Sequence, residues 1–261
     1  MFEARGKIIK NQRLSDRIFI LTIDCEVVAK NANPGQFVML SPPKITNLTL
    51  RRPFSLYNVI DDKQLSILLK VAGKGTQLLS TLTPEVELSL HGPLGNGFPL
   101  PNPSKKLLIV AGGVGAAPFY FFAHKLKNNH IKPIFLLGGK TKNEIPFYED
   151  FKKIFDSIFI TTEDGTIGKK GMITDYLNDF IEDDILIYAS GPIPMLKKIA
   201  LIAEKNDLDW FLSLESYMAC GVGACLSCVV PAKNEQQKYL RCCKDGPIFS
   251  GKQIAWERYD C

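Results

Sequence analysis

The stretch "LLIVAGGVGAAPFYFFA", residues 107–123, joins a continuous apolar run to a glycine cluster and then to apolar residues at helical spacing. This order is typical of a buried parallel strand, a tight turn and a helix. Three more apolar runs, at 131–139, 157–164 and 184–192, end in small or turn-forming residues. "FYEDFKKIF" (147–155) and "MITDYLNDFI" (172–181) have the pattern of amphipathic helices. The pattern predicts a doubly wound parallel α/β domain whose ligand lies beyond the carboxyl ends of the strands.

The first hundred residues follow a different pattern. Short β-like runs separated by turn signals stand at 17–24, 35–41, 65–71 and 86–92. Frequent breaks between short strands predict a small antiparallel β-barrel. A segment rich in proline and glycine at 92–106 then marks the connection between two domains. We expect three parts, at residues 1–101, 102–212 and 213–261.

Composition narrows the class of protein. The chain has 261 residues, of which 46% are hydrophobic and 23% charged, and a net charge of +5. Its lysines are scattered and form no basic block with aromatic residues, which argues against nucleic-acid binding. The first seventeen residues carry charges throughout and contain no apolar core of signal-peptide length, and the run at 107–123 is shorter than a membrane span. We therefore expect a cytoplasmic protein without a membrane segment.

Two stretches of the barrel suggest a phosphate-bearing ligand. Arg52-Pro53-Phe54-Ser55, within "RRPFSLYN" (51–58), can offer a guanidinium, a ring edge and a hydroxyl to one planar, charged ligand. Gly75-Thr76, within Gly73–Thr76, opens a predicted helix whose N-terminal N–H groups could face an anion. The alternatives are a surface strand with one buried Phe and a plain turn with Thr76 as N-cap.

The α/β domain contains two loops that fit a nucleotide. Gly112, Gly113 and Gly115 occupy the first strand-helix turn, where they would let a pyrophosphate approach the backbone. Their spacing departs from G-x-G-x-x-G, and close packing of helix on sheet is the alternative. Ser190-Gly191-Pro192 ends a later strand at the same edge and leaves space for a flat ring, unless Pro192 merely begins a helix.

The strongest signal is a group of cysteines. Five of the seven cysteines in the chain fall between positions 220 and 243. Cys220-x4-Cys225-x2-Cys228, followed by Cys243, has the C-x4-C-x2-C…C form of plant-type 2Fe-2S centres, and the small residues between the first two leave room for a cluster. Structural zinc is the alternative. Zinc sites normally use two Cys-x2–4-Cys pairs, and here only Cys225-x2-Cys228 and the distant pair Cys242-Cys243 would serve. Cys242 competes with Cys243 as the fourth ligand.

Together these motifs resemble the ferredoxin-reductase superfamily, with Arg52–Ser55 matching its flavin motif and Gly112–Gly115 with Pro118 matching its nicotinamide-nucleotide loop. "LESYMACGVGACLSC" with "CKDGPIF" further resembles the iron-sulfur, electron-transfer subunits of type B dihydroorotate dehydrogenases. The resemblance covers nearly the whole chain. It implies an FAD-binding barrel, an NAD-binding α/β domain and a C-terminal 2Fe-2S segment, in that order.

The resemblance also implies roles for individual residues. The residues that would hold FAD are Arg52, Pro53, Phe54, Ser55, Leu68, Leu69, Lys70, Gly75 and Thr76. The cluster ligands would be Cys220, Cys225, Cys228 and Cys243. The chemistry would belong to the cofactors: a separate FMN-containing subunit oxidises dihydroorotate for pyrimidine synthesis, and electrons pass through the cluster and FAD to NAD⁺. The implied assembly is a heterotetramer with two copies of each subunit. Superfamily members commonly have a cysteine near the nicotinamide where this chain has Ser190, so that thiol is not carried over.

Two questions stay open in the sequence. Glu163 and Asp164 follow a strand where an adenosine ribose could lie, and their carboxylates favour NAD over NADP, although Lys169 and Lys170 nearby weaken this inference. The partner is the second question, because flavin and iron-sulfur subunits of ferredoxin-NAD(P) or sulfide-linked oxidoreductases share the architecture. A zinc-stapled binding module without enzymatic activity is a third hypothesis.

Overall fold

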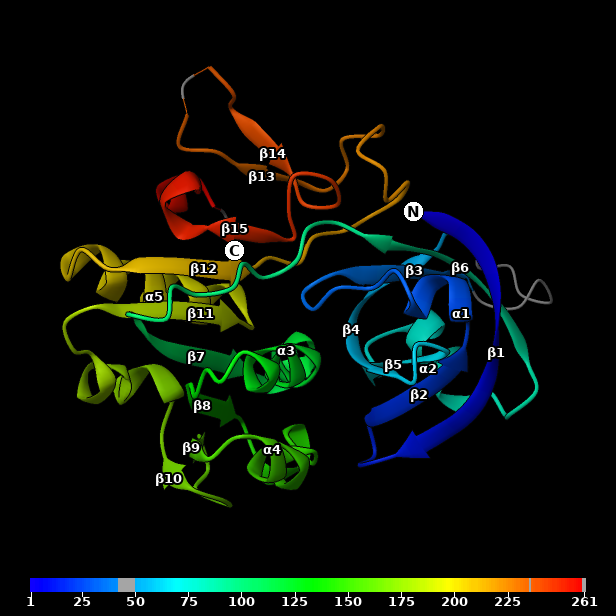
Figure 1. Ribbon diagram of the computed structural model, residues 1–261, viewed down its shortest axis with the longest axis horizontal. Helices are drawn as coiled ribbons and strands as arrows, with labels where there is room; N and C mark the ends of the chain where they lie inside the picture. The colour runs from blue at the N-terminus through cyan, green and yellow to red at the C-terminus, as the bar shows by residue number, and fades with distance from the viewer. Residues whose placement is uncertain (42–49, 235, 260–261) are drawn as a thin grey trace.

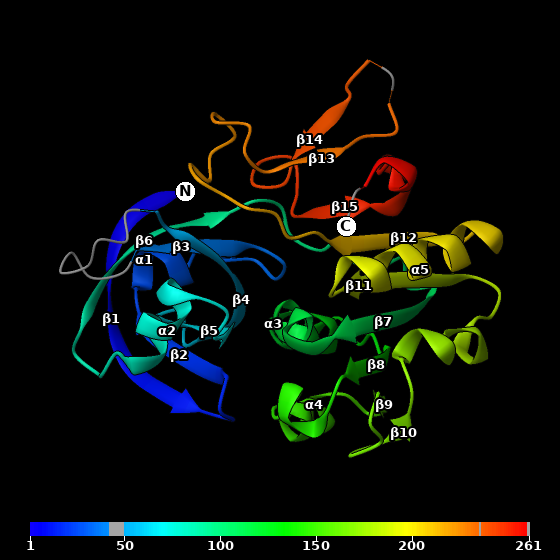
Figure 2. The same cartoon turned by 180° about the vertical axis from the view of Figure 1, so that it is seen from behind.

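The computed structural model describes residues 1–41, 50–234 and 236–259. Two bodies lie side by side, and the C-terminal segment runs across the junction between them (Figures 1 and 2). The body that contains the N-terminus is the barrel, and the other is built on a mostly parallel sheet.

The N-terminal body is a closed antiparallel barrel of six strands in the order β1-β2-β5-β4-β3-β6. Its elements are β1 (Phe2–Arg13), β2 (Ile18–Asp24), α1 (Glu26–Ala29), β3 (Phe37–Ser41), β4 (Arg52–Ile60), β5 (Gln64–Lys70), α2 (Lys74–Thr81) and β6 (Glu87–Leu94). Alternating residues such as Leu21, Ile67 and Leu90 fill the interior completely, so the barrel is a packed core and not a pore.

The second body is a seven-stranded sheet in the order β10-β9-β8-β7-β11-β12-β15. Its strands are β7 (Lys106–Gly112), β8 (Ile134–Gly139), β9 (Ser157–Thr162), β10 (Lys169–Lys170), β11 (Ile185–Ser190), β12 (Asp209–Ser213) and β15 (Ile248–Ser250). All neighbours are parallel except β12 and β15, and the order reverses direction around β7. The predicted barrel and doubly wound α/β sheet are thereby confirmed.

Helices cover both faces of this sheet. The helices are α3 (Ala117–Asn128), α4 (Tyr148–Ile154) and α5 (Ile193–Lys205). Alternate residues of β7 divide between two cores: Leu107 and Ile109 pack with α3 and α4, whereas Leu108 and Val110 pack with α5. Helix α3 also faces the barrel, where Tyr120 stacks on Tyr57 of β4 with ring centroids 4.5 Å apart. The two bodies therefore share an apolar interface.

The amphipathic helix predicted at 172–181 is wrong. The segment instead forms two short 3₁₀ turns, η3 (Ile173–Asp175) and η4 (Leu177–Phe180). The Asp175 carboxylate accepts the N–H of Met172 at 3.1 Å, which caps the first turn locally and competes with a continuous helix. Ile173 also packs under Gly138, where a Cβ would lie 2.8 Å from it, so packing against β8 fixes the turn in place.

The C-terminal segment belongs to both bodies. After a hairpin of β13 (Val229–Pro231) and β14 (Tyr239–Arg241), the strand β15 pairs with β12 and extends the sheet. Asn96, just after the barrel, accepts the N–H of Ile248 at 3.0 Å, and its own N–H donates to the Gly246 carbonyl at 2.7 Å. These bonds fix the cysteine segment relative to the barrel. None of the helices in the described part of the chain has the length and apolar character needed to span a bilayer.

Candidate redox-cofactor site

Arg52 lies over the first turn of helix α2. A Cβ placed on Gly75 would lie 2.2 Å from Arg52 Nε, so only glycine allows the helix to approach the guanidinium this closely. The first N–H groups of a helix have no intrahelical acceptor and attract anions. The structure thus brings together the two barrel stretches that the sequence singled out, as a guanidinium beside a helix N-terminus.

Thr76 has a structural task in this loop. Its hydroxyl accepts the N–H groups of Ala72 and Gly73 at 2.8 and 3.1 Å and donates to the Gly73 carbonyl at 3.0 Å. Gly73 is the N-cap and Thr76 the third helical residue, so the alternative that made Thr76 the N-cap is wrong. With its hydroxyl engaged, Thr76 can offer an anion mainly its backbone.

The other predicted barrel residues differ in what they expose. Pro53, Phe54 and Ser55 are half-buried on β4, opposite β3. Leu68 packs toward α3 and Leu69 into the barrel, and both are buried, so a ligand beside β5 would meet main-chain groups there. The next residue, Lys70, forms an ion pair with Glu144 of η2 (Lys142–Glu144). This ion pair joins the barrel to the α/β domain, which is the nucleotide-type domain.

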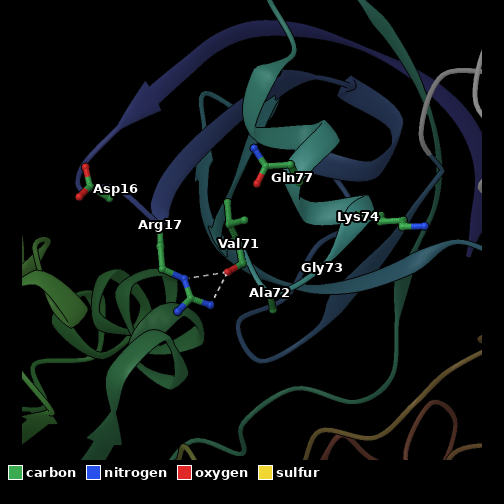
Figure 3. A pocket seen from close by; sticks show the side chains of 7 residues that line it. All are labelled: Asp16, Arg17, Val71, Ala72, Gly73, Lys74 and Gln77. Carbon is green, nitrogen blue, oxygen red and sulfur yellow. Dashed lines mark hydrogen bonds between the residues drawn. The ribbon is translucent and has the colours of Figure 1, made fainter.

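A hollow of about 490 Å³ lies beside the N-terminus of α2 (Figure 3). It is lined by Asp16, Arg17, Val71, Ala72, Gly73, Lys74 and Gln77. Arg17 donates from Nε and Nη2 to the Val71 carbonyl at 3.1 and 2.8 Å, which fixes its guanidinium beside the hollow. Sequence reasoning missed Asp16 and Arg17, because only the barrel closure brings the β1-β2 turn to this place.

The glycine loop after β7 divides into two roles. A Cβ on Gly115 would lie 2.7 Å from Gly191 Cα and from the Ser190 carbonyl, and one on Gly112 would lie 2.9 Å from Pro192 Cδ. These two glycines allow the loops after β7 and β11 to pack together. Gly113 has a φ of +55°, and a Cβ there would meet nothing within 4 Å, so its backbone is open to a ligand.

The acidic residues after β9 lie at the same carboxyl edge of the sheet. Asp164 accepts the N–H and the hydroxyl of Thr166 at 3.0 and 2.7 Å, and these bonds lower the pKa of its carboxyl group. Asp164 is therefore engaged in shaping the turn. Glu163 is exposed, and its N–H is fixed to the Gly139 carbonyl at 3.0 Å. Lys169 and Lys170 on β10 are exposed beside them.

The predicted cluster ligands form two pairs. Cys220 Sγ accepts the N–H groups of Val222 and Cys225 at 3.4 Å, and Cys228 Sγ accepts the N–H of Cys243 at 3.4 Å. The backbone N–H of Val222 is the first cause that lowers the pKa of Cys220 to about 6. Burial, followed by a hydrogen bond with the Cys228 side chain, raises the pKa of Cys243 to about 12.

Cys242 points in another direction. It is fully buried, and its Sγ donates to the Leu214 carbonyl at 2.9 Å, at the end of β12. Burial raises the pKa of this thiol strongly. Of the two competing cysteines, Cys243 is therefore the one whose backbone N–H donates to the sulfur atom of another predicted ligand, Cys228.

The loop that carries these thiols needs glycine. Gly221 and Gly223 have φ values of +71° and +81°. A Cβ on Gly221 would lie 3.1 Å from Met39 Cγ and 3.3 Å from Leu94 Cδ1, so the loop rests on strands β3 and β6 of the barrel. In the part of the chain that the structure describes, no three His, Cys, Asp or Glu side chains form a group that could hold a single metal ion. Four thiols in two close pairs fit the donor set of a two-iron centre.

Comparison with known proteins gives the fold and the kind of C-terminal domain. A family model described as the iron-sulfur cluster binding domain of dihydroorotate dehydrogenase B matches residues 215–255. A solved structure titled as an NADH-dependent reduced ferredoxin-NADP oxidoreductase superposes with a TM-score of 0.87 and 29% identity, covering 97% of this chain and 91% of that one. The FAD/NAD binding domain of nitric oxide dioxygenase from Vibrio cholerae shares the fold at 17% identity and a TM-score of 0.68, covering 80% of this chain and 97% of its own.

The fold and the site thus define an oxidoreductase of the ferredoxin-reductase type with an appended iron-sulfur segment. Two curated relatives are named dihydroorotate dehydrogenase B (NAD(+)), electron transfer subunit. The Clostridium acetobutylicum protein is 38% identical, and the alignment covers 95% of each chain. The Listeria welshimeri protein is 34% identical, and the alignment covers 98% of this chain and 100% of that protein. The chain belongs to this family of electron transfer subunits, as its motifs predicted.

Proposed function

We propose that this chain is the electron transfer subunit of an NAD-dependent dihydroorotate dehydrogenase in UMP synthesis. It passes electrons from the FMN of a catalytic partner subunit through a 2Fe-2S cluster and FAD to NAD⁺. The observation that carries the proposal is the packing of the cysteine loop on the barrel. Gly221 packs against Met39, and Met39 pairs with Pro53 of the flavin motif on the neighbouring strand. One strand therefore separates the proposed cluster loop from the proposed flavin strand.

The barrel supplies the FAD site. Arg52 and the N–H groups of Gly75 and Thr76 would bind the diphosphate, because a guanidinium and a helix N-terminus both favour an anion there. Pro53, Phe54 and Ser55 would lie along the ring system, and residues 68–70 would contact it mainly through the main chain. The hollow beside Gly73 and Lys74 would take the adenosine end.

The C-terminal segment supplies the cluster site. Cys220 and Cys225 would ligate one iron, and Cys228 and Cys243 the other. The closeness of each pair supports this assignment, as does the hydrogen bond that turns Cys242 toward Leu214. The N–H groups already directed at Cys220 and Cys228 would stabilise bound thiolates.

The nucleotide-type domain supplies the NAD site. Gly113 would let the pyrophosphate approach the backbone, while Gly112 and Gly115 keep the loops after β7 and β11 together. Ser190, Gly191 and Pro192 would border the nicotinamide at the end of β11. Glu163 would accept from the ribose 2′-hydroxyl, and Asp164 would hold the turn that carries it.

The residues position the cofactors and need no proton-transfer role. When bound, NAD exchanges a hydride, a 2Fe-2S centre exchanges single electrons, and FAD can do both. The chain holds the three sites at fixed relative positions through the Tyr57–Tyr120 stack and the Asn96 bonds to the cysteine segment. The fixed geometry is its contribution to the rate.

The partner and the setting complete the proposal. The family name "electron transfer subunit" implies a catalytic partner. We infer a heterotetramer with two copies of each subunit. We also infer a cytoplasmic location, because cysteines at metal-ligand spacing are typical of a reducing compartment.

A ferredoxin-NAD(P) oxidoreductase role is the second candidate, because the structure at 29% identity carries that activity in its title. Co-expression with a dihydroorotate dehydrogenase catalytic subunit separates the two. NADH formation from dihydroorotate by the copurified complex supports the first role. Reduction of ferredoxin by NADH or NADPH, without any dihydroorotate-dependent activity, supports the second.

A further inference from the structure

The turn that carries Cys243 is built around one carbonyl group. The main-chain oxygen of Arg241, at the end of β14, accepts the N–H groups of Lys244, Asp245 and Gly246 at 3.1, 2.8 and 3.3 Å. These three bonds close the chain around Cys243. The backbone of Arg241 is thereby fixed two residues before the proposed fourth ligand.

Asp245 fixes the guanidinium itself. Arg241 Nε donates to Asp245 Oδ2 at 2.9 Å and Nη2 donates to Oδ1 at 2.8 Å, which is a bidentate pair. The Arg241 N–H donates to the same carboxylate at 2.8 Å. The two side chains are only 31% and 22% exposed, so solvent screens the pair less than an ordinary surface pair.

The third guanidinium nitrogen is directed at the cysteine loop. Arg241 Nη1 lies 3.5 Å from the Gly223 carbonyl. A Cβ on Gly223 would lie 2.8 Å from Lys244 Cδ and 3.5 Å from Arg241 Cδ, so the apex of the loop packs against the stems of both basic side chains. Arg241 therefore connects the loop of Cys220 and Cys225 to the turn of Cys243.

The same turn places Arg241 beside the second sulfur pair. Arg241 stands two residues before Cys243, whose N–H donates to Cys228 Sγ at 3.4 Å. Lys244 is exposed on the same turn, so its charge is screened by solvent.

We propose that Arg241, oriented by Asp245, is a positioning residue that sets the reduction potential of the cluster and anchors the cysteine loop at Gly223. The inference rests on the proposed function, since it requires the cluster. Taking up one electron adds one negative charge to the thiolate-bound centre, and a fixed cation beside it favours the reduced form. Asp245 carries the opposite charge, so its removal acts in the opposite direction.

An EPR-monitored redox titration of the cluster-loaded protein, with dithionite as the reductant, tests this inference. We expect Arg241→Gln to lower the equilibrium constant for one-electron reduction about tenfold, equal to about 59 mV. Asp245→Asn should raise it. Lys244→Gln, the matched control on the same turn, should change it less than about threefold because its ammonium group is screened.

The outcomes separate the inference from the proposed function. A wild-type protein without the signal of a reduced 2Fe-2S centre contradicts the proposed function. A wild-type signal with an unchanged potential in Arg241→Gln, or a lowered potential in both Arg241→Gln and Asp245→Asn, overturns the role of Arg241. If Arg241→Gln loses the cluster, Arg241→Lys is measured instead, because it keeps the charge. A potential near that of the wild type supports the inference, and a potential lower by about 59 mV contradicts it.

Discussion

Gly221 of the cysteine loop lies against Met39 of the barrel, with 3.1 Å between its added Cβ position and Met39 Cγ. Met39 in turn pairs with Pro53 across the β3-β4 ladder. Segments more than 150 residues apart in the chain therefore meet where the proposed cluster and flavin sites adjoin. In the proposed function, this contact would give electrons a short route between the cluster and the flavin.

Gly221→Ala should weaken this contact. The new Cβ meets Met39 and the residue sits at a φ of +71°, where a side chain is strained. We expect a loss of about 1–3 kcal/mol in the free energy of unfolding and a lower iron content. Denaturant titration and iron analysis measure both. Ala224→Ser, at an exposed position of the same loop, should leave both unchanged, and an equal loss in that control would contradict the explanation.

Gly75→Ala should weaken FAD binding while leaving the fold intact. The added methyl displaces the end of the flexible Arg52 side chain, which can move at little cost but then leaves the helix N-terminus. We expect at least about a tenfold rise in the dissociation constant for FAD, because a charge-assisted contact is worth about 1.5–3 kcal/mol. Flavin fluorescence titration measures it.

Thr81→Ala is the matched control for the FAD experiment. Thr81 is exposed in the last turn of α2, and its hydroxyl donates to the Leu78 carbonyl at 2.9 Å. This variant should bind FAD as the wild type does. Equal FAD affinity in Gly75→Ala and Thr81→Ala would show that Arg52 does not need its place over the helix.

Cys243→Ala and Cys242→Ala should differ in iron content. We expect Cys243→Ala to lose most of the about two irons and two acid-labile sulfides per chain, because it removes a proposed ligand. Cys242→Ala should keep the iron and lose about 1–2 kcal/mol of stability, since its buried thiol bonds the Leu214 carbonyl. Iron retention in Cys243→Ala with loss in Cys242→Ala would reverse the ligand assignment.

Glu163→Gln should relax the choice of nucleotide. The carboxylate repels a 2′-phosphate, and its removal should raise kcat/KM for NADP⁺ about three- to tenfold relative to NAD⁺. Steady-state assays with both nucleotides measure the ratio. Asp164→Asn, which disturbs the turn bonded to Thr166, should impair both nucleotides together. An unchanged ratio in Glu163→Gln would place the adenosine ribose elsewhere.

His91 should make the protein less stable in mild acid. Burial, and then the Arg51 charge, lowers the pKa of this imidazole, so the unfolded chain binds the proton more readily than the folded one. Stability therefore falls as the pH drops through the unfolded pKa of about 6.5 and levels off below the folded value. Since the ring is only partly buried, we expect a loss of at most about 0.5 kcal/mol. Denaturant titrations from pH 7.5 to 5.5 should show a smaller loss in His91→Gln, and identical slopes would contradict the assignment.

Local sequence patterns were sufficient for the architecture. Short β-like runs with frequent turn signals predicted the barrel, and the alternation of apolar strands with helices after residue 106 predicted the doubly wound sheet. The helix expected at 172–181 was wrong because the Asp175 carboxylate and packing under Gly138 override an amphipathic pattern. The division of the chain at 101/102 and 212/213 stays a prediction, and β15 from the last part completes the sheet of the second.

The sequence by itself determined the chemistry of the site: four thiols at a cluster spacing, an Arg-x-Phe-Ser strand and glycine turns, since those residue types and spacings suit few other ligands. Only the tertiary structure decided where each of two neighbouring residues lies. Adjacent cysteines are equivalent in a spacing pattern, but the closed turn at Arg241 directs Cys242 to Leu214 and brings Cys243 to Cys228. The approach of Arg52 to Gly75, and of Gly221 to Met39, depends on chain segments that meet only when the barrel closes and the last strand joins the sheet.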